Sequence, residues 1–285
     1  MTTMTPTGLA KQFITIEQQQ LAYIDAGDPA LPVVVMIHGW MSHSRVWRHT
    51  LLQLQDRYRC LAVDLLGYGH SARPPGADYS IEAQGRRVLA LLDALGIDRF
   101  TLIGHSMGGQ ISLCIAAQLA PERVIRVIDV AGVVSGRLQP YPRYIVLPRA
   151  WVAQYLPFLV RLSRSAARLP AYRRVEFSSW SLNHLPLAEW DEDVALALPP
   201  DCHHAIYPSG KAIISTDLSS ALGQIRVPTL VIFGTADRVV PPEEGDLVAQ
   251  RVPHCRIVRL AGAGHFPMLE RRAEFHDAVN TFLSS

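Results

Sequence analysis

The sequence predicts an α/β fold: a mostly parallel sheet flanked by helices, with an inserted helical cap. Two observations predict this fold. Over residues 1–134, short apolar runs rich in β-branched residues alternate with amphipathic segments, and the alternation resumes after residue 223. Residues 135–223 instead contain many prolines, three tryptophans and a cluster of arginines, without a run typical of a buried strand. We therefore expect one core domain made of residues 1–134 and 224–285, with residues 135–223 as a helical cap, or lid.

The core strands are predicted by continuous apolar runs, and the helices between them by apolar residues at helical spacing. Phe13–Glu17 and Leu21–Asp25 are expected to form an opening hairpin. The later strands read as buried on both faces, which is typical of a parallel sheet, and we place them at Val33–Ile37, Cys60–Val63, Phe100–Ile103, Val124–Val130, Thr229–Phe233 and Arg256–Leu260. Helices are expected near residues 46–54, 81–95, 107–119 and 272–283. Loops that follow the parallel strands should therefore meet at one edge of the sheet.

The composition is that of a globular protein without a strongly charged partner. The 285 residues are 49% hydrophobic and 18% charged, and a formal net charge of +2 gives no signal of nucleic-acid binding. The four cysteines are scattered without a CxxC pair, so we expect free thiols in a reducing compartment. Signal-peptide and membrane-length apolar runs are lacking. We expect a cytoplasmic protein, monomeric or homodimeric, without stable membrane insertion.

The strongest functional motif is Gly104-His105-Ser106-Met107-Gly108, which lies between a predicted strand and a predicted helix. A G-x-S-x-G turn requires this placement, and small residues around the serine let strand and helix approach closely. Ser106 would stand at the carboxyl edge of the sheet and at a helix N-terminus, where backbone dipoles favour negative charge. The alternative is a glycine-rich turn whose serine only caps the helix. We interpret Ser106 as a nucleophile.

A serine hydroxyl needs a general base beside it to become a nucleophile at neutral pH. His265 follows the last predicted strand in a glycine-rich turn, so it should emerge at the same sheet edge as Ser106. Asp237 follows the preceding strand and would orient the imidazole and stabilise its protonated form. Asp129, which lies near the end of an earlier strand, is the competing acid. We expect a catalytic triad of Ser106, Asp237 and His265.

The tetrahedral intermediate of acyl transfer needs main-chain N–H donors for its oxyanion. The amide of Met107, directly after the nucleophile, should supply one donor. The loop after Val33–Ile37 should supply the second, which we assign to the amide of Trp40. His38 and Gly39 are expected to shape this loop rather than to bind substrate.

Asp64 also follows a predicted strand, and it precedes the glycine-containing loop of residues 65–71. Hydrogen bonding within that loop is the favoured interpretation of this carboxylate, ahead of a role in catalysis.

Taken in this order and context, the motifs resemble those of the α/β-hydrolase superfamily, from about Phe13 to Leu283. The resemblance implies an eight-stranded, mostly parallel sheet with a helical cap inserted after the sixth strand, and it agrees with the chain order serine, aspartate, histidine. Ser106 differs from the aspartate that epoxide hydrolases and haloalkane dehalogenases carry at this turn. The matching segments are His38-Gly39-Trp40 and residues 64–71, 104–109, 227–237 and 264–265.

The cap is expected to set specificity, with an apolar pocket above Ser106. Candidate lining residues, each of which could instead pack the cap onto the core, are Trp151, Tyr155, Phe158, Trp180 and Trp190. A basic face at helical spacing, which is either solvated or meets an anionic acyl carrier or a membrane surface, is formed by Arg161, Arg164 and Arg168. Cys202, His203 and His204 lack a further ligand at metal-site spacing, so no metal is expected.

These residues predict a serine hydrolase that cleaves carboxylic esters of small to medium apolar acyl groups through an acyl-enzyme, without a cofactor. Cleavage of a thioester, a lactone or a carbon–carbon bond uses the same groups and stays open. A small-molecule receptor on the same fold, with incidental turnover, is the alternative from outside the enzymes.

Overall fold

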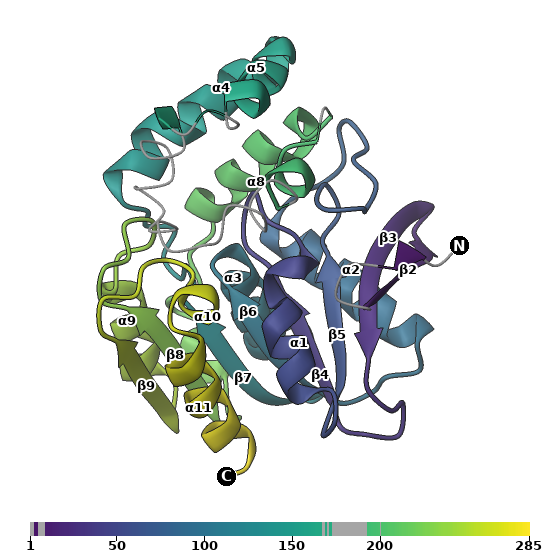
Figure 1. Ribbon diagram of the computed structural model, residues 1–285. Helices are drawn as coiled ribbons and strands as arrows, with labels where there is room; N and C mark the ends of the chain where they lie inside the picture. Colours follow the sequence, from purple (N-terminus) through teal and green to yellow (C-terminus); the bar gives the residue numbers. More distant parts are fainter. Residues whose placement is uncertain (1–2, 5–8, 167–168, 170, 173–192, 200) are drawn as a thin grey trace.

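The computed structural model describes residues 3–4, 9–166, 169, 171–172, 193–199 and 201–285. Its sheet has nine described strands in the order β1-β2-β3-β5-β4-β6-β7-β8-β9 (Figure 1). The pairs β1–β2, β2–β3 and β3–β5 are antiparallel. The pairs β5–β4, β4–β6, β6–β7, β7–β8 and β8–β9 are parallel. The strands are β1 Thr3–Met4, β2 Ala10–Ile16, β3 Gln19–Ala26, β4 Val33–Ile37, β5 Arg59–Asp64, β6 Phe100–His105, β7 Val124–Val130, β8 Thr229–Gly234 and β9 Cys255–Leu260.

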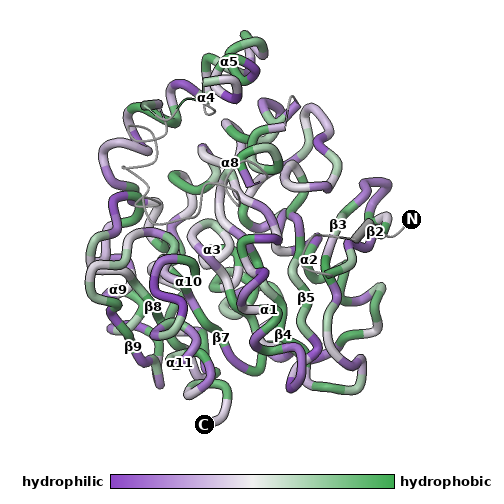
Figure 2. The backbone as a smooth tube through the Cα atoms, in the orientation of Figure 1, coloured by the Kyte–Doolittle hydropathy of each residue, from purple (hydrophilic) through white to green (hydrophobic). Residues whose placement is uncertain are grey.

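The predicted fold class is confirmed. β2 to β9 are the eight expected strands, each within a few residues of its predicted range, and β1 adds only two residues at the edge. The central strands are predictable because they carry β-branched and aliphatic residues that are buried on both faces: every residue of β6 and β8 is buried. The hydrophobic strands β4 and β5 lie at the centre of the molecule in Figure 2.

Helices cover both faces of the sheet. α1, α10 and α11 lie in front of the strands in Figure 1, and α2 lies behind them. Ser80 caps α2, since its side chain accepts a hydrogen bond from the amide of Ala83. The α-helices are α1 Arg48–Leu54, α2 Ile81–Ala94, α3 Met107–Cys114, α4 Leu147–Tyr155, α5 Phe158–Ala166, α8 His203–Ser215, α9 Glu243–Arg251, α10 Pro267–Glu270 and α11 Arg272–Leu283. Shorter 3₁₀ or π segments are Ser44–Trp47, Ile115–Leu119, Pro142–Val146 and Leu222–Gln224.

The described helices between β7 and β8, which are α4, α5 and α8, lie beyond one end of the strands (Figure 1). α8 is attached directly to the core, because the Gln110 side chain on α3 donates hydrogen bonds to the carbonyls of Ile213 and Thr216. α4 packs on α8, and α5 packs on α4 at the outermost part of the molecule. Among the described helices, none is both long enough and apolar enough to cross a bilayer.

Candidate active site

Ser106 lies on a strained turn between β6 and α3. Its φ of 55° and ψ of −117° are rare for a residue with a side chain. The turn requires small neighbours: a Cβ at Gly104 would come within 2.2 Å of the Gly108 carbonyl oxygen. Ser106 is the N-cap residue of α3, so its hydroxyl stands beside N–H groups that have no acceptor within the helix. This arrangement is the strand–turn–helix that the motif predicted.

His265 and Asp237 are joined by a hydrogen bond at this same edge. His265 Nδ1 lies 2.8 Å from Asp237 Oδ2, and both side chains are buried. The other carboxylate oxygen of Asp237 accepts the amides of Val239 at 2.7 Å and Val240 at 3.0 Å. Because an ionised carboxylate only accepts, Nδ1 of His265 is the donor and Nε2 is left as an acceptor. An imidazole held in this tautomer is equipped to take a proton from a hydroxyl.

His105 ties the His265 loop to the turn that carries Ser106. His105 Nε2 donates to the main-chain oxygen of His265 over 2.7 Å, and the two ring centroids are 4.7 Å apart. Burial, followed by the nearby His265 ring, holds the pKa of His105 well below its ordinary value, so His105 is neutral. Since His105 directly precedes Ser106, this bond places the imidazole loop beside the serine turn.

Glu270 fixes the same loop from the other side. Its carboxylate oxygens accept the amide of Gly264 at 2.8 Å and the amide of Phe266 at 2.9 Å, which are the residues on either side of His265. Burial is the main cause that raises the pKa of Glu270. Neither His105 nor Glu270 was singled out from the sequence, because bonds to main-chain groups depend on loop geometry.

Asp129, the competing acid, is fully buried near the end of β7, and neither of its carboxylate oxygens accepts a hydrogen bond from a described residue. Burial, together with the negative charge of Glu244, raises the pKa of Asp129 to about 8. The imidazole of His265 is bonded to Asp237 instead. The geometry therefore favours Asp237 over Asp129 as the partner of the histidine.

The loop after β4 packs against Ser106. A Cβ at Gly39 would lie 2.9 Å from the Cβ of Ser106, so only glycine allows this approach. His38 shapes the loop, with Nδ1 donating to the Gly39 carbonyl at 2.7 Å and Nε2 accepting the Leu65 amide at 3.1 Å. Burial lowers the pKa of His38 to about 4, which keeps it neutral and able to make both bonds.

The two residues expected to supply oxyanion donors flank this contact. Met107 is the first residue of α3 and is fully buried. Trp40 follows Gly39, and its indole Nε1 donates to the carbonyl of Ile206 on α8 over 2.8 Å. The Trp40 side chain therefore anchors the loop to α8.

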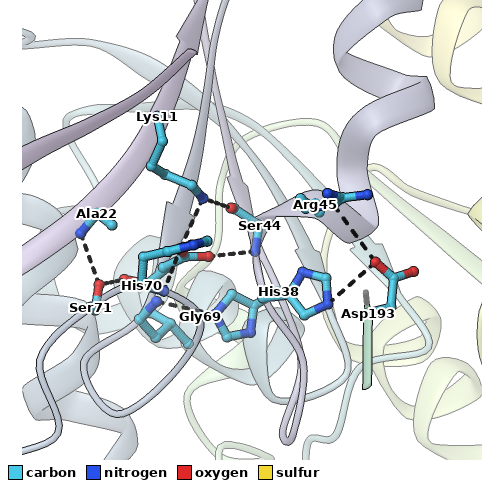
Figure 3. Close-up of polar contacts among 12 residues, drawn as sticks. Lys11, Ala22, His38, Ser44, Arg45, Gly69, His70, Ser71 and Asp193 are labelled. Carbon is cyan, nitrogen blue, oxygen red and sulfur yellow. Dashed lines mark hydrogen bonds and ion pairs between the residues drawn. The ribbon is translucent and has the colours of Figure 1, made fainter. Parts of the chain in front are cut away.

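Asp64 makes the predicted hydrogen bond within its loop and also binds residues outside that loop. It accepts the His70 amide at 3.0 Å, within the loop named in the prediction, and also the Ser44 amide at 2.7 Å. It pairs with the buried Lys11 at 2.9 Å, and Lys11 also reaches the Ser44 hydroxyl (Figure 3). Burial alone would raise the pKa of Asp64, but Lys11 and the bonds from His70 hold it well below its ordinary value. Lys11 was missed because the sequence gives no sign that a lysine at the start of β2 is buried.

An apolar cavity of about 500 Å³ lies among α4, α5 and α8. Its wall includes Met41, which follows Trp40, and Ile206, whose carbonyl binds the Trp40 indole. The side chains of α4 and α5 that line it include Ala150 and Val160, and Val146 of the preceding π segment lines it too. In the described ranges, no group of three or more histidine, cysteine or acidic side chains is placed to hold a metal ion.

The three proposed pocket aromatics that the structure describes are not in this cavity wall. Trp151, Tyr155 and Phe158 are exposed on the outer side of α4 and α5, because these helices direct their smaller apolar residues inward. Trp180, Trp190 and Arg168 lie outside the described residues. Arg161 is exposed and Arg164 is partly exposed.

The chain belongs to the α/β-hydrolase fold family, whose model matches residues 32–272. It is 30% identical to an uncharacterised protein of Mycobacterium tuberculosis, over 96% of this chain and 81% of that protein. It is also 30% identical to the pimeloyl-[acyl-carrier protein] methyl ester esterase of Nitrosomonas europaea, over 86% of this chain and 92% of the esterase.

Among solved structures, the enol-lactonase of Burkholderia xenovorans aligns with a TM-score of 0.78 at 27% identity, covering 96% of this chain and all of the lactonase chain. The protein is thus a hydrolase of the α/β fold.

Proposed function

We propose that this hydrolase cleaves carboxylic esters of small to medium apolar acyl groups through an acyl-enzyme. One observation carries the proposal: the 2.8 Å bond between His265 and Asp237, on a loop that His105 ties to the serine turn. The similarity to a methyl ester esterase supports the choice of an ester. In this proposal the core of residues 1–134 and 224–285 supplies all of the catalytic groups, and residues 135–223 form the cap.

The proposed reaction follows from these groups. The Ser106 oxygen attacks the ester carbonyl carbon while its proton passes to Nε2 of His265. Asp237 keeps its bond to Nδ1 and stabilises the imidazolium. The main-chain amides of Trp40 and Met107 bind the oxyanion of the tetrahedral intermediate. The imidazolium then protonates the departing alkoxide, which leaves as the alcohol and yields the acyl-enzyme.

Deacylation repeats these steps with water as the nucleophile. His265 accepts a proton from a water molecule while the water oxygen attacks the acyl carbon. His265 then returns the proton to the Ser106 oxygen, and the carboxylic acid leaves. The apolar cavity beside Met41 would receive the acyl group. No metal or organic cofactor takes part in this scheme.

The test is hydrolysis of p-nitrophenyl acetate and butyrate by the parent and by Ser106→Ala. We expect many turnovers from the parent and a loss of at least about 10³-fold in the variant, because members of a triad act as a unit. Turnover by the parent should also fall as the pH is lowered, since the imidazole must be unprotonated to act as base. A single slow turnover would favour the receptor alternative.

A substrate panel separates the related reactions. One preparation of the enzyme is assayed with esters, thioesters, lactones and ring-fission dienones. These substrates differ in the bond that is cleaved and in the leaving group, while the catalytic groups stay the same. Higher kcat/KM for a lactone or a carbon–carbon bond than for every ester would overturn the assignment to esters but not the proposed nucleophile.

A further inference from the structure

The described part of the cap concentrates the exposed hydrophobic side chains of this protein. Apart from Leu52, every large hydrophobic side chain found exposed in the described residues lies between residues 144 and 169. Tyr144 is 70% exposed and Phe158 is 59% exposed. Soluble proteins seldom gather such residues without a partner. We use the term outer cap face for the set Tyr144, Trp151, Tyr155, Phe158 and Leu162.

The outer cap face is a stripe made of two rows at helical spacing. Tyr144, Trp151 and Tyr155 are seven and four residues apart in the helical run of residues 142–155, and Phe158 and Leu162 are four residues apart on α5. The stripe runs along α4 and α5, which form the outermost part of the molecule in Figure 1. A projecting ridge of this kind fits a broad surface better than it fits the groove of a folded partner.

The charge of the same segment has one sign. Residues 135–175 contain eight arginines and no aspartate, glutamate or lysine, although acidic residues outnumber basic ones in the rest of the chain. Arg149 and Arg161 are exposed on α4 and α5, beside the apolar stripe. Guanidinium groups match the geometry of phosphate, and tryptophan and tyrosine favour the membrane–water boundary. The complementary surface is therefore anionic and apolar at once.

The cavity among α4, α5 and α8 connects this face to the proposed catalytic loop. Val152 and Leu162 line the cavity and are also exposed on the outside. Met41, which also lines the cavity, directly follows Trp40 in the sequence. The wall is almost wholly apolar, apart from a few groups such as Arg149, whose guanidinium donates to the Tyr172 hydroxyl over 3.2 Å.

We propose that the outer cap face binds the surface of an anionic phospholipid bilayer, and that the cavity receives an acyl chain of an ester that partitions into that surface. The first part depends on no catalytic property. The second part rests on the proposed function. Binding is peripheral: the stripe enters the headgroup region while the arginines contact lipid phosphates.

The binding test is sedimentation of the full chain with vesicles of phosphatidylcholine alone or mixed with phosphatidylglycerol. We expect binding to the mixed vesicles that weakens with added salt, and little binding to phosphatidylcholine. Arg161→Gln should weaken binding about fivefold, and Tyr144→Ser should weaken it further in the double variant. The matched controls are Arg86→Gln on α2 and Leu52→Ser on α1, which are exposed away from the cap and should bind as the parent does.

Equal binding to both vesicle types would overturn the proposal that the outer cap face binds anionic bilayers. Parent-like binding by the double variant of Arg161→Gln and Tyr144→Ser would overturn it too. So would a stable dimer of the parent that Tyr144→Ser dissociates, because the face would then bind a second copy of the chain. Esterase activity of the parent separates the two proposals: a parent that binds mixed vesicles but does not turn over esters overturns the proposed function and leaves the binding surface standing. Ser106→Ala should bind vesicles as the parent does.

The acyl-chain part is tested by filling the cavity. Ala153 lines it, and Ala153→Trp should lower the ratio of p-nitrophenyl decanoate to acetate hydrolysis several-fold while vesicle binding is retained. An unchanged ratio in a variant that still hydrolyses acetate would place the acyl chain elsewhere and overturn this part.

Discussion

The backbone of Ser106 is held in a conformation that few residues adopt, and main-chain hydrogen bonds hold it there. The Ser106 amide donates to the Val130 carbonyl at 2.9 Å, and its carbonyl accepts the Gln110 amide at 3.1 Å. A non-glycine residue in such a region costs on the order of 1–3 kcal/mol. Strain of this size at a serine between a strand and a helix is expected where the hydroxyl must be presented, which agrees with the proposed nucleophile.

A pair of aspartate variants tests the choice of acid at the residue scale. Asp237→Asn should lower kcat on the order of 10⁴-fold, because an amide favours the wrong tautomer of His265. Asp129→Asn should retain activity within a few-fold, since Asp129 makes no hydrogen bond to His265. Steady-state hydrolysis of p-nitrophenyl butyrate by both variants measures the contrast. A large loss in Asp129→Asn with none in Asp237→Asn would reverse the assignment.

Residues at strand ends could be identified from the sequence, whereas their supporting residues could not. Ser106, Asp237 and His265 each follow a strand that its apolar run makes recognisable. Lys11 and Glu270 act through contacts with residues whose positions depend on the folded loops, so nothing in their local sequence distinguishes them from surface charges. Spacing thus predicts which side chains share an edge but not which groups hold them there.

The elements of the core follow from their own sequences more closely than those of the cap do. The core strands carry apolar residues on both faces, so burial is their only stable state. α4 carries apolar residues both toward the cavity and on its exposed side, so the sequence alone cannot decide which of them face inward. The large aromatics were expected inside, but Ala150 and Val160 take that place and Trp151 is outside.

Asp193 joins the cap segment to the core through ion pairs, and a substitution at this residue tests that connection between elements. It lies 3.8 Å from Arg45 Nε, the contact drawn in Figure 3. Arg48 Nη1 is 3.4 Å from the same carboxylate, and His43 Nε2 is 3.6 Å from it. Burial lowers the pKa of His43 to about 3, so the two arginines carry the charge. Asp193→Asn should loosen the cap, raise KM for esters about two- to fivefold with a smaller change in kcat, and speed proteolysis within the cap.

The matched control for this change is Asp201→Asn. Asp201 also joins the cap segment to the core, through Arg73 at 3.7 Å, but its side chain is 54% exposed against 17% for Asp193. Solvent screens the more exposed pair, so this variant should resemble the parent in both assays. Equal effects of the two variants would show that burial of Asp193 does not set the strength of the contact.

At the scale of the whole molecule, two buried carboxylates respond to pH in opposite directions. Asp64 has a pKa well below its ordinary value, so its contribution to stability is present above that ordinary value and is lost only as the solution becomes strongly acidic. Asp129 has its pKa raised to about 8, chiefly by burial. Asp129 binds a proton in the folded protein that it has released in the unfolded chain, over the range between about pH 4 and pH 8.

The parent should therefore lose stability relative to Asp129→Asn as the pH rises from about 5 to 8. Over that range the folded state binds more protons than the unfolded state at this site, so the difference in free energy of unfolding between parent and variant should fall, with a slope approaching about 1.4 kcal/mol per pH unit. Above about pH 8 the difference should level off, because the folded carboxyl has also ionised. Urea unfolding of both proteins at several pH values measures it, and contributions from Asp64 and other groups cancel in the comparison. Parallel stability curves for parent and variant across this range would mean that Asp129 is ionised in the folded protein at neutral pH, with a compensating partner at its two carboxylate oxygens.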